Sequence, residues 1–371
     1  MSSQNKIHTS ALLVFFVLSF GFAQAQDSSL IDAARNQDIE QVSQLLADGA
    51  DPNARQTDGA TALHWAAYHE NLDLADLLIK AGAAASAVNR LNASPLYLAV
   101  RGGNAELTKL LLDAGANPNV TLDMGETPIM TAARAGSAAA VQYLIDSGAN
   151  VNVREESREQ TALMWASAQG HVEVVRVLVE AGASLEARSR VRPMLMFAEA
   201  TNGGAFDQGV MENLGGYSAL LFAARHGQVE ISNLLITAGA DINGQAGNGT
   251  TPLIVATHSG HSALAQMLLA QGADPNSMRA GYSALHAAIL RSDRDTVASL
   301  LANGADPNVR LQKATPAQRA SEDWVLKTPL IGATPYWIAA SFREVEIMQI
   351  LAGGGADPLL TNQERFQPLR D

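Results

Sequence analysis

The chain has 371 residues, 47% of them hydrophobic, so it can bury a large core and exceeds the size of one usual domain. Its 25 lysines and arginines are outnumbered by 37 aspartates and glutamates, which gives a net charge of −12. Duplex DNA and anionic lipid surfaces are bound by strongly cationic faces, so this charge argues against both as main partners. We therefore expect no nucleic-acid partner.

The first 25 residues are typical of a secretory signal peptide. Lys6 makes the start weakly positive, the apolar run ALLVFFVLSFGFA follows, and small residues precede a cleavage that we expect after Ala25. The run has 13 residues, whereas about 20 are needed to span a bilayer, so no membrane span is predicted. The chain also lacks cysteine and cannot form disulfides. These features predict a mature protein, residues 26–371, that is periplasmic or secreted.

A Gly-Ala dipeptide recurs after runs of leucine or valine along the mature chain. Its glycines are Gly49, Gly82, Gly115, Gly148, Gly182, Gly239, Gly272, Gly304 and Gly355; six of the eight intervals are 32 to 34 residues, and two are much longer. Within one unit, residues 61–83 predict two short helices: Thr61 can cap the first, and Gly82 suits the left-handed end of the second. Neither helix can bury its apolar stripe alone, so neighbouring units must stack.

These units resemble ankyrin repeats, whose signature is T-P-L-H-x-A. The best matches are TALHWAA at 61–67, TPLIVAT at 251–257 and SALHAAI at 283–289, and the ending GADPN follows at several of the glycines. The resemblance covers nearly all of the mature chain. It implies an all-α solenoid of paired antiparallel helices joined by hairpin loops, with about nine repeats. Residues 367–371, QPLRD, read as the start of a truncated tenth repeat.

The positions of the histidines predict structural roles rather than catalysis or metal binding. His64 and His286 occupy the histidine position of the signature, where the resemblance implies a hydrogen bond that stabilises a turn. His69 is five residues from His64, so the two rings diverge around a helix and cannot share a metal. The triplet His226, His258 and His261 remains a zinc-site alternative. We predict no catalytic residue, no cofactor and no metal.

The resemblance also implies a concave face that grips another protein with inner-helix side chains. The first exposed position of successive inner helices carries three arginines, a tyrosine and a histidine: Tyr68, Arg101, Arg134, Arg225 and His258. Arginine binds carboxylates through a rigid fork, so this row is predicted to contact a partner protein. The alternative is an ordinary solvated row of polar side chains.

The two long intervals point to insertions of about 24 and 18 residues, near 188–214 and 310–331. Both fall in loops on the hairpin edge, about 30 Å apart if stacked helices are spaced near 10 Å. Interface cores are enriched in arginine, methionine and aromatic residues. We therefore predict partner contacts at Arg190, Arg192, Met194, Met196, Phe197 and Trp324. Alternatively, these segments fold back over the scaffold as a lid.

Together these features predict an exported scaffold, with monomer favoured, that binds an exported or envelope protein through its concave face and both insertions, used as a two-point clamp. The alternative is an enzyme, or a protein that binds a small molecule or metal, with carboxylates from the insertions: Glu199, Asp207 and Glu212, or Glu322 and Asp323. A binder exposes apolar side chains on its insertions. An enzyme brings two or more carboxylates or histidines together beneath a loop.

Overall fold

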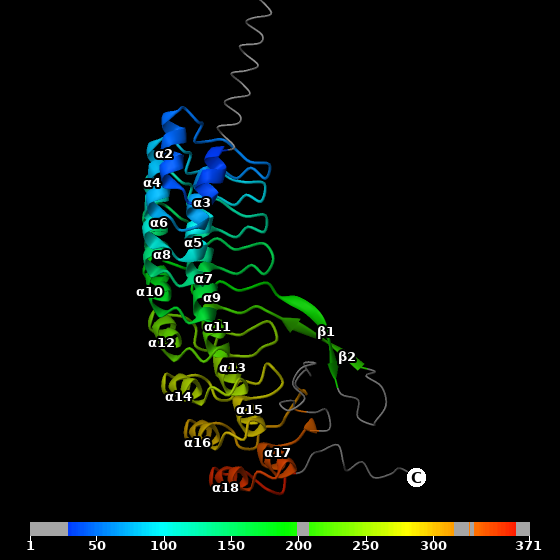
Figure 1. The fold of residues 1–371 in the computed structure, drawn as a ribbon. Helices are drawn as coiled ribbons and strands as arrows, with labels where there is room; N and C mark the ends of the chain where they lie inside the picture. Colours follow the sequence, from blue (N-terminus) through cyan, green and yellow to red (C-terminus); the bar gives the residue numbers. More distant parts are fainter. Residues whose placement is uncertain (1–28, 199–207, 315–325, 327–329, 361–371) are drawn as a thin grey trace, which may run out of the picture. The chain divides into compact units, whose positions relative to one another are not determined.

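The computed structural model describes residues 29–198, 208–314, 326 and 330–360 (Figure 1). The predicted signal peptide at 1–25 and the QPLRD segment lie outside these residues. The chain divides into two compact units, residues 1–157 with 180–182 and residues 158–179 with 183–371. Both units are built from helix pairs, which confirms the predicted all-α class. No helix in the described segments is both long and apolar enough to cross a membrane.

The first unit stacks its helices in two layers. A helical stretch at residues 29–35 is followed by α2 (Ile39–Ala47), α3 (Ala62–Tyr68), α4 (Leu72–Lys80), α5 (Pro95–Gly102), α6 (Ala105–Asp113), α7 (Pro128–Ala135) and α8 (Ala138–Asp146). The inner helices α3, α5 and α7 pack one on the next, and the outer helices α4, α6 and α8 do the same. Each inner helix thus buries its apolar side between two neighbours and its own outer helix.

The second unit repeats this arrangement and adds one small sheet. Its elements are α9 (Ala162–Gln169), α10 (Val172–Glu180), β1 (Arg192–Ala198), β2 (Gln208–Leu214), α11 (Ala219–Arg225), α12 (Val229–Thr237), α13 (Pro252–His258), α14 (Ser262–Ala270), α15 (Ala284–Leu290), α16 (Arg294–Ala302), α17 (Pro335–Phe342) and α18 (Val345–Gly353). The inner layer runs α9, α11, α13, α15 and α17, and α12, α14, α16 and α18 form the outer layer.

The inner helices begin at residues that suit a helix start. Ser94 Oγ accepts a hydrogen bond from the Tyr97 amide at 3.1 Å, and Thr251 caps α13 in the same way. Proline occupies the first turn of α5, α7, α13 and α17, where a missing amide donor costs nothing. These local choices place every inner helix at the same point of its repeat.

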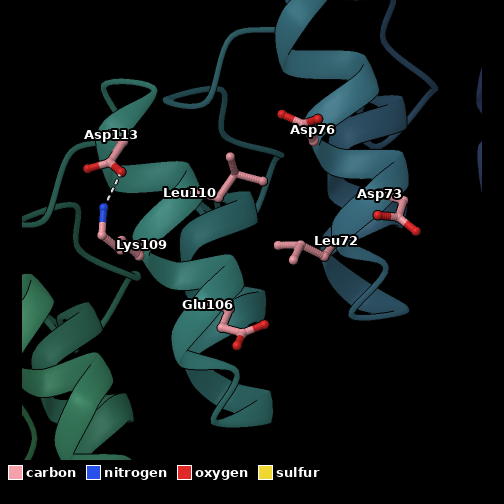
Figure 2. Close-up of a pocket in the computed structure, with 7 residues that line it drawn as sticks. All are labelled: Leu72, Asp73, Asp76, Glu106, Lys109, Leu110 and Asp113. Carbon is pink, nitrogen blue, oxygen red and sulfur yellow. Dashed lines mark hydrogen bonds and ion pairs between the residues drawn. The ribbon is translucent and has the colours of Figure 1, made fainter.

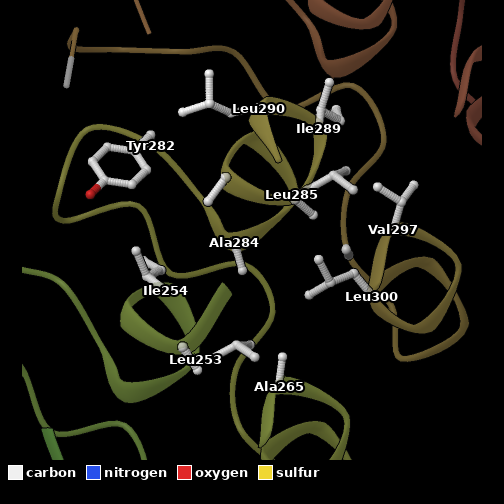
Figure 3. Packing of buried hydrophobic residues seen from close by; sticks show 14 of the residues in the cluster. Leu253, Ile254, Ala265, Tyr282, Ala284, Leu285, Ile289, Leu290, Val297 and Leu300 are labelled. Carbon is white, nitrogen blue, oxygen red and sulfur yellow. The ribbon is translucent and has the colours of Figure 1, made fainter. Parts of the chain in front are cut away.

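Figure 3 shows the core of the second unit between α13, α15 and α16. Leu253, Leu285 and Ile289 of the inner helices belong to one cluster with Val297 and Leu300 of α16, and all five residues are at most 1% exposed. Neighbouring repeats therefore share one continuous core, and none could bury these side chains alone.

Asparagines in the repeat endings connect neighbouring repeats. Asn119 Nδ2 donates to the Gly148 carbonyl at 2.9 Å, and its Oδ1 accepts from the Asn150 amide at 2.9 Å. Asn53 makes the same pair of bonds to Gly82 and Ala84. The asparagine of GADPN and GANPN thus links the repeats that carry it to the next repeat.

Replacing Asn119 with alanine should lower the unfolding free energy of the first unit by about 1 to 2 kcal/mol, because two hydrogen bonds are lost at an exposed position. Asn117→Ala is the control, since Asn117 bonds only within its own loop, to the Asn119 amide. Urea unfolding of both variants measures the difference. Equal losses would show that the inter-repeat bonds contribute nothing specific.

Candidate protein-binding surfaces

A hydrogen bond closes the loop between consecutive repeats, and the two insertions lie within two such loops. In ordinary repeats this bond spans four residues, as from the Gln56 amide to the Ala60 carbonyl at 2.9 Å. The corresponding bond from Ser189 to Tyr217 spans 28 residues, and that from Leu311 to Ala333 spans 22, both at 3.0 Å. The loops thus carry 24 and 18 extra residues, while the closing bond keeps the repeats in place.

The first insertion forms an antiparallel β-hairpin, a feature absent from the sequence-based expectation of loops between helices. β1 and β2 pair from Arg192 with Leu214 to Ala198 with Gln208, and they lie on the loop side of the second unit (Figure 1). The segment RPMLMFA is a continuous apolar run without the alternation that marks a half-buried strand. Pairing with β2, rather than its own pattern, makes it a strand.

The two faces of this hairpin differ in what they contact. Leu195 lies opposite Met211, and their side chains are 54% and 59% exposed. Met194 lies opposite Glu212, and this pair belongs to the other face because side chains alternate along a strand. Glu212 is only 5% exposed, whereas Met194 is 48% exposed. One face therefore presents an apolar cross-strand pair, and the other holds a buried carboxylate.

The two insertions meet at this carboxylate. Lys313, at the start of the second insertion, donates its ammonium group to Glu212 Oε1, although 101 residues separate the two in sequence. The amides of Gln312 and Lys313 both donate to the Gly281 carbonyl, at 2.8 and 3.1 Å, and fix the approach of Lys313. Lys313 thus contacts the hairpin, although the repeat count predicted about 30 Å between the two loops.

The arginines at the hairpin base also bond within the protein. Arg190 Nε lies 3.1 Å from Glu159, and its amide donates to the Arg158 carbonyl at 2.7 Å. Arg192 begins β1 and is exposed. Met196 and Phe197 occupy described backbone positions of β1, but their side chains and Trp324 lie outside what the structure describes. The predicted partner contacts at these positions stay predictions.

In the first unit, the predicted inner-helix row begins with an aromatic cluster. The rings of Tyr68 and Trp65 meet edge to face at 5.8 Å, and the Arg35 guanidinium lies 4.7 Å from the Trp65 ring centre. Tyr68 is nevertheless 54% exposed. Arg101 is also exposed, whereas Arg134 forms a 3.0 Å ion pair with Glu126. Tyr68 and Arg101 thus present a neighbouring aromatic ring and cation to solvent.

The histidines of the signature stabilise turns, as the resemblance implied. His64 Nδ1 accepts the Thr61 amide at 3.1 Å, and its Nε2 lies 3.1 Å from the Ala93 carbonyl. His286 Nδ1 accepts the Ser283 amide in the same way. Burial lowers the pKa of both imidazoles, that of His286 to about 4. Both rings are therefore neutral structural groups at pH 7.

In the second unit, Arg225 is exposed but His258 is half-buried, so this part of the row is less open than expected. His258 Nδ1 is buried without a hydrogen-bond partner among the described residues. Among the described residues, no group of three or more histidine, aspartate or glutamate side chains is arranged to hold a metal. The triplet His226, His258 and His261 is therefore not arranged as a zinc site.

A groove that the sequence did not reveal lies between the outer helices α4 and α6 (Figure 2). Its volume is about 300 Å³, and its lining combines two leucines, four carboxylates and one ammonium group: Leu72, Leu110, Asp73, Asp76, Glu106, Asp113 and Lys109. Lys109 and Asp113 pair at 2.5 Å. No local motif marks this groove, because its two walls come from adjacent repeats.

The family model described as ankyrin repeats matches residues 30–122, 101–189 and 220–311, which together make up more than half of the chain. The chain belongs to the ankyrin-repeat family. Both insertions of this ankyrin-repeat protein interrupt the pattern: residues 190–219 and those after 311 fall outside the matched segments.

Curated relatives share the repeats over short segments. The chain is 33% identical over 167 residues to "Mitochondrial disaggregase" of Bos taurus, which is 35% of this chain and 25% of the relative. It is 32% identical over 139 residues to "Putative ankyrin repeat-containing protein" of Treponema pallidum (strain Nichols), 37% and 41% of the two chains. It is 40% identical over 108 residues to "Neurogenic locus notch homolog protein 1" of Danio rerio, 29% and 4%. The chain spans less than half of each of these relatives.

Proposed function

We propose that this ankyrin-repeat protein binds another protein, and that the β1–β2 hairpin is its principal contact. Ankyrin repeats generally mediate protein–protein interaction. The observation that carries the proposal is the cross-strand pair Leu195–Met211, which leaves more than half of two large apolar side chains in water. Such side chains are favourable at the centre of an interface, where water is excluded.

The opposite face of the hairpin supports binding rather than catalysis. An enzymatic site would need several carboxylates or histidines beneath the insertions. Glu212 is the candidate carboxylate that the structure describes, and its partner is the Lys313 ammonium group. Glu199, Asp207, Glu322 and Asp323 lie outside the described residues. The Glu212–Lys313 pair ties the two insertions together, so the hairpin meets a partner in one orientation.

The proposal includes export. The apolar run before Ala25 and the small residues at the cleavage position support a cleaved signal peptide. The partner would then be a periplasmic, envelope or secreted protein. N-terminal sequencing of the protein purified from an exported fraction should begin at Gln26, and recovery of an intact Met1 would contradict export by this route.

Partner capture by hairpin variants tests the binding surface. Leu195→Ser combined with Met211→Ser should reduce capture from an exported fraction at least about tenfold, because each buried apolar side chain contributes about 1.5 to 3 kcal/mol. The control combines Leu91→Ser with Met124→Ser, two apolar side chains of the first unit that are 67% and 55% exposed. Quantitative mass spectrometry compares both with the unchanged protein.

The control should capture the same partner as the unchanged protein, and all three proteins should melt alike. If both double variants retain the partner equally, the hairpin is not the contact. If the control alone loses it, the binding surface belongs to the first unit.

A further inference from the structure

A group of basic side chains gathers in the second unit where the inner helices end. It consists of Arg225 and His226 at the end of α11, His258 and His261 at the two ends of the α13–α14 turn, and Arg291 at the end of α15. We call these five residues the basic cluster. They come from three consecutive repeats of an acidic protein with a net charge of −12.

Close contacts hold the N-terminal half of the basic cluster together. His261 Nε2 lies 3.1 Å from the Arg225 carbonyl oxygen, so Nε2 carries the proton and Nδ1 is the free acceptor. The ring rests on Gly227, where an added Cβ would lie 2.6 Å from Nδ1. Glycine at 227 therefore allows His261 to reach the end of α11. His226 and Arg225 are exposed beside it.

In the other half of the basic cluster, one repeat further on, a side chain again packs on a glycine. The Arg291 guanidinium rests on Gly260, where an added Cβ would lie 2.6 Å from its Nη2. The His258 ring packs on Tyr282 with 6.2 Å between ring centres, and its Nδ1 is the buried atom without a partner. Burial first, and then the nearby Arg291 charge, lower the pKa of His258. Burial, Arg225 and His261 act on the pKa of His226 in the same direction.

The carboxylates nearest this edge are mostly bonded to other groups. Asp293 accepts from the hydroxyls of Ser262 and Thr296, Glu344 accepts from Ser292, and Glu346 pairs with Arg294. Glu230 and Asp295 lie in the first turns of α12 and α16, where the helix dipole stabilises them. These acids thus have bonding partners or helix dipoles of their own. Tyr217 and Tyr282 also face the cluster, and burial raises the pKa of both, so they stay neutral.

We propose that the basic cluster binds carboxylates of an acidic segment in the partner protein, and that this binding tightens as the pH falls below neutrality. The inference rests on the proposed protein-binding function. Arg225 and Arg291 supply permanent charges, and His226 and His258 accept protons when carboxylates approach. Each carboxylate offsets the repulsion between cationic side chains, so binding is accompanied by proton uptake.

An acidic probe peptide tests this directly. Fluorescence anisotropy of labelled octaglutamate is titrated with the untagged chain, residues 26–371, at pH 7.5 and 5.5 and low ionic strength. The glutamates remain mostly ionised at both pH values. We expect the Kd to fall about fivefold or more at pH 5.5, and an uncharged Gly-Ser peptide of equal length should not bind.

Matched substitutions show where on the protein the octaglutamate peptide binds. Arg225→Gln should weaken binding at both pH values, whereas His226→Gln should mainly remove the pH dependence. His261→Gln should weaken binding because the ring no longer bonds to the Arg225 carbonyl. The controls are Arg101→Gln, at the same inner-helix position as Arg225, and His171→Gln, which precedes α10 as His261 precedes α14. His226 is exposed, so H226Q tests the proposal even if H261Q destabilises the repeat.

Absence of octaglutamate binding at both pH values, or equal effects of control and cluster substitutions, would overturn the proposal. This outcome is separate from failure of the hairpin proposal, which depends on partner capture by the Leu195 and Met211 variants. Capture that depends on the hairpin, together with no octaglutamate binding, would leave the protein-binding function intact and remove only the acidic-segment inference.

Discussion

Lowering the pH from 7.5 to 5 should cost the second unit about 2 kcal/mol of unfolding free energy through His286 alone. Its imidazole is fully buried, and burial lowers its pKa from 6.5 to about 4. Its Nδ1 accepts the Ser283 amide at 3.1 Å, so a proton on Nδ1 would place two donors against each other. The folded protein therefore resists protonation of this ring.

Stability falls at low pH because the unfolded and folded states bind the proton at different pH values. The unfolded chain takes up the proton near pH 6.5, and the folded chain does so near pH 4. Stability is therefore complete above pH 6.5, falls between pH 6.5 and 4, and then levels off. The full loss from this group is about 3 kcal/mol.

Urea unfolding at a series of pH values measures this effect, with Trp337 of α17 as a fluorescent reporter close to α15. His286→Gln should lower the unfolding free energy at pH 7.5. Between pH 7.5 and 5, however, the variant should lose about 2 kcal/mol less than the unchanged protein. An identical pH profile for H286Q and the unchanged protein would show that His286 does not titrate as described.

Replacing Gly215 with alanine should make the base of the hairpin open more easily. Gly215 has φ +94°, and an added Cβ would overlap the carbonyl oxygen of Arg190. Its own carbonyl also accepts the Gly247 amide at 2.9 Å, so the residue cannot shift without breaking that bond. Backbone strain and overlap together should reduce the free energy of local opening by about 3 kcal/mol.

Hydrogen exchange of the β1 and β2 amides measures this opening. A loss of about 3 kcal/mol corresponds to exchange about a hundredfold faster. Gly239→Ala is the control, because Gly239 has φ +102° but no atom within 4 Å of an added Cβ. It should leave exchange in the hairpin unchanged. Unchanged hairpin protection in Gly215→Ala would mean that the base does not depend on this glycine.

The repeat fold could be predicted from the sequence because the residues that begin and end each helix lie within the same repeat. Thr61, Ser94 and Thr251 start inner helices, and the repeated glycines adopt the positive φ that ends outer helices, as at Gly82 and Gly239. Caps, prolines and glycines act within a few residues, so they remain visible in a linear pattern. The turn-stabilising roles of His64 and His286 followed from the same repeat position.

The candidate binding surfaces were less accessible to this reasoning. The residues of the predicted row lie on inner helices, but their exposure and pairing depend on neighbours: Arg134 pairs with Glu126, and His258 is half-buried against Tyr282. The cross-strand pair Leu195–Met211 could not be identified, because RPMLMFA lacks alternation and QGVMENL offers no turn signal that fixes their register.

By itself, the sequence determined the family, the helix pairs and the places where the repeat is interrupted, because these depend on contacts between residues less than one repeat apart. Only the tertiary structure decided that the first insertion forms a hairpin and that Lys313 reaches it. Glu212 and Lys313 are 101 residues apart, and their contact requires a strand pairing and the stacking of several repeats at once. The same stacking gathers the basic cluster from three repeats, since residues at equivalent positions become neighbours only when the repeats pack.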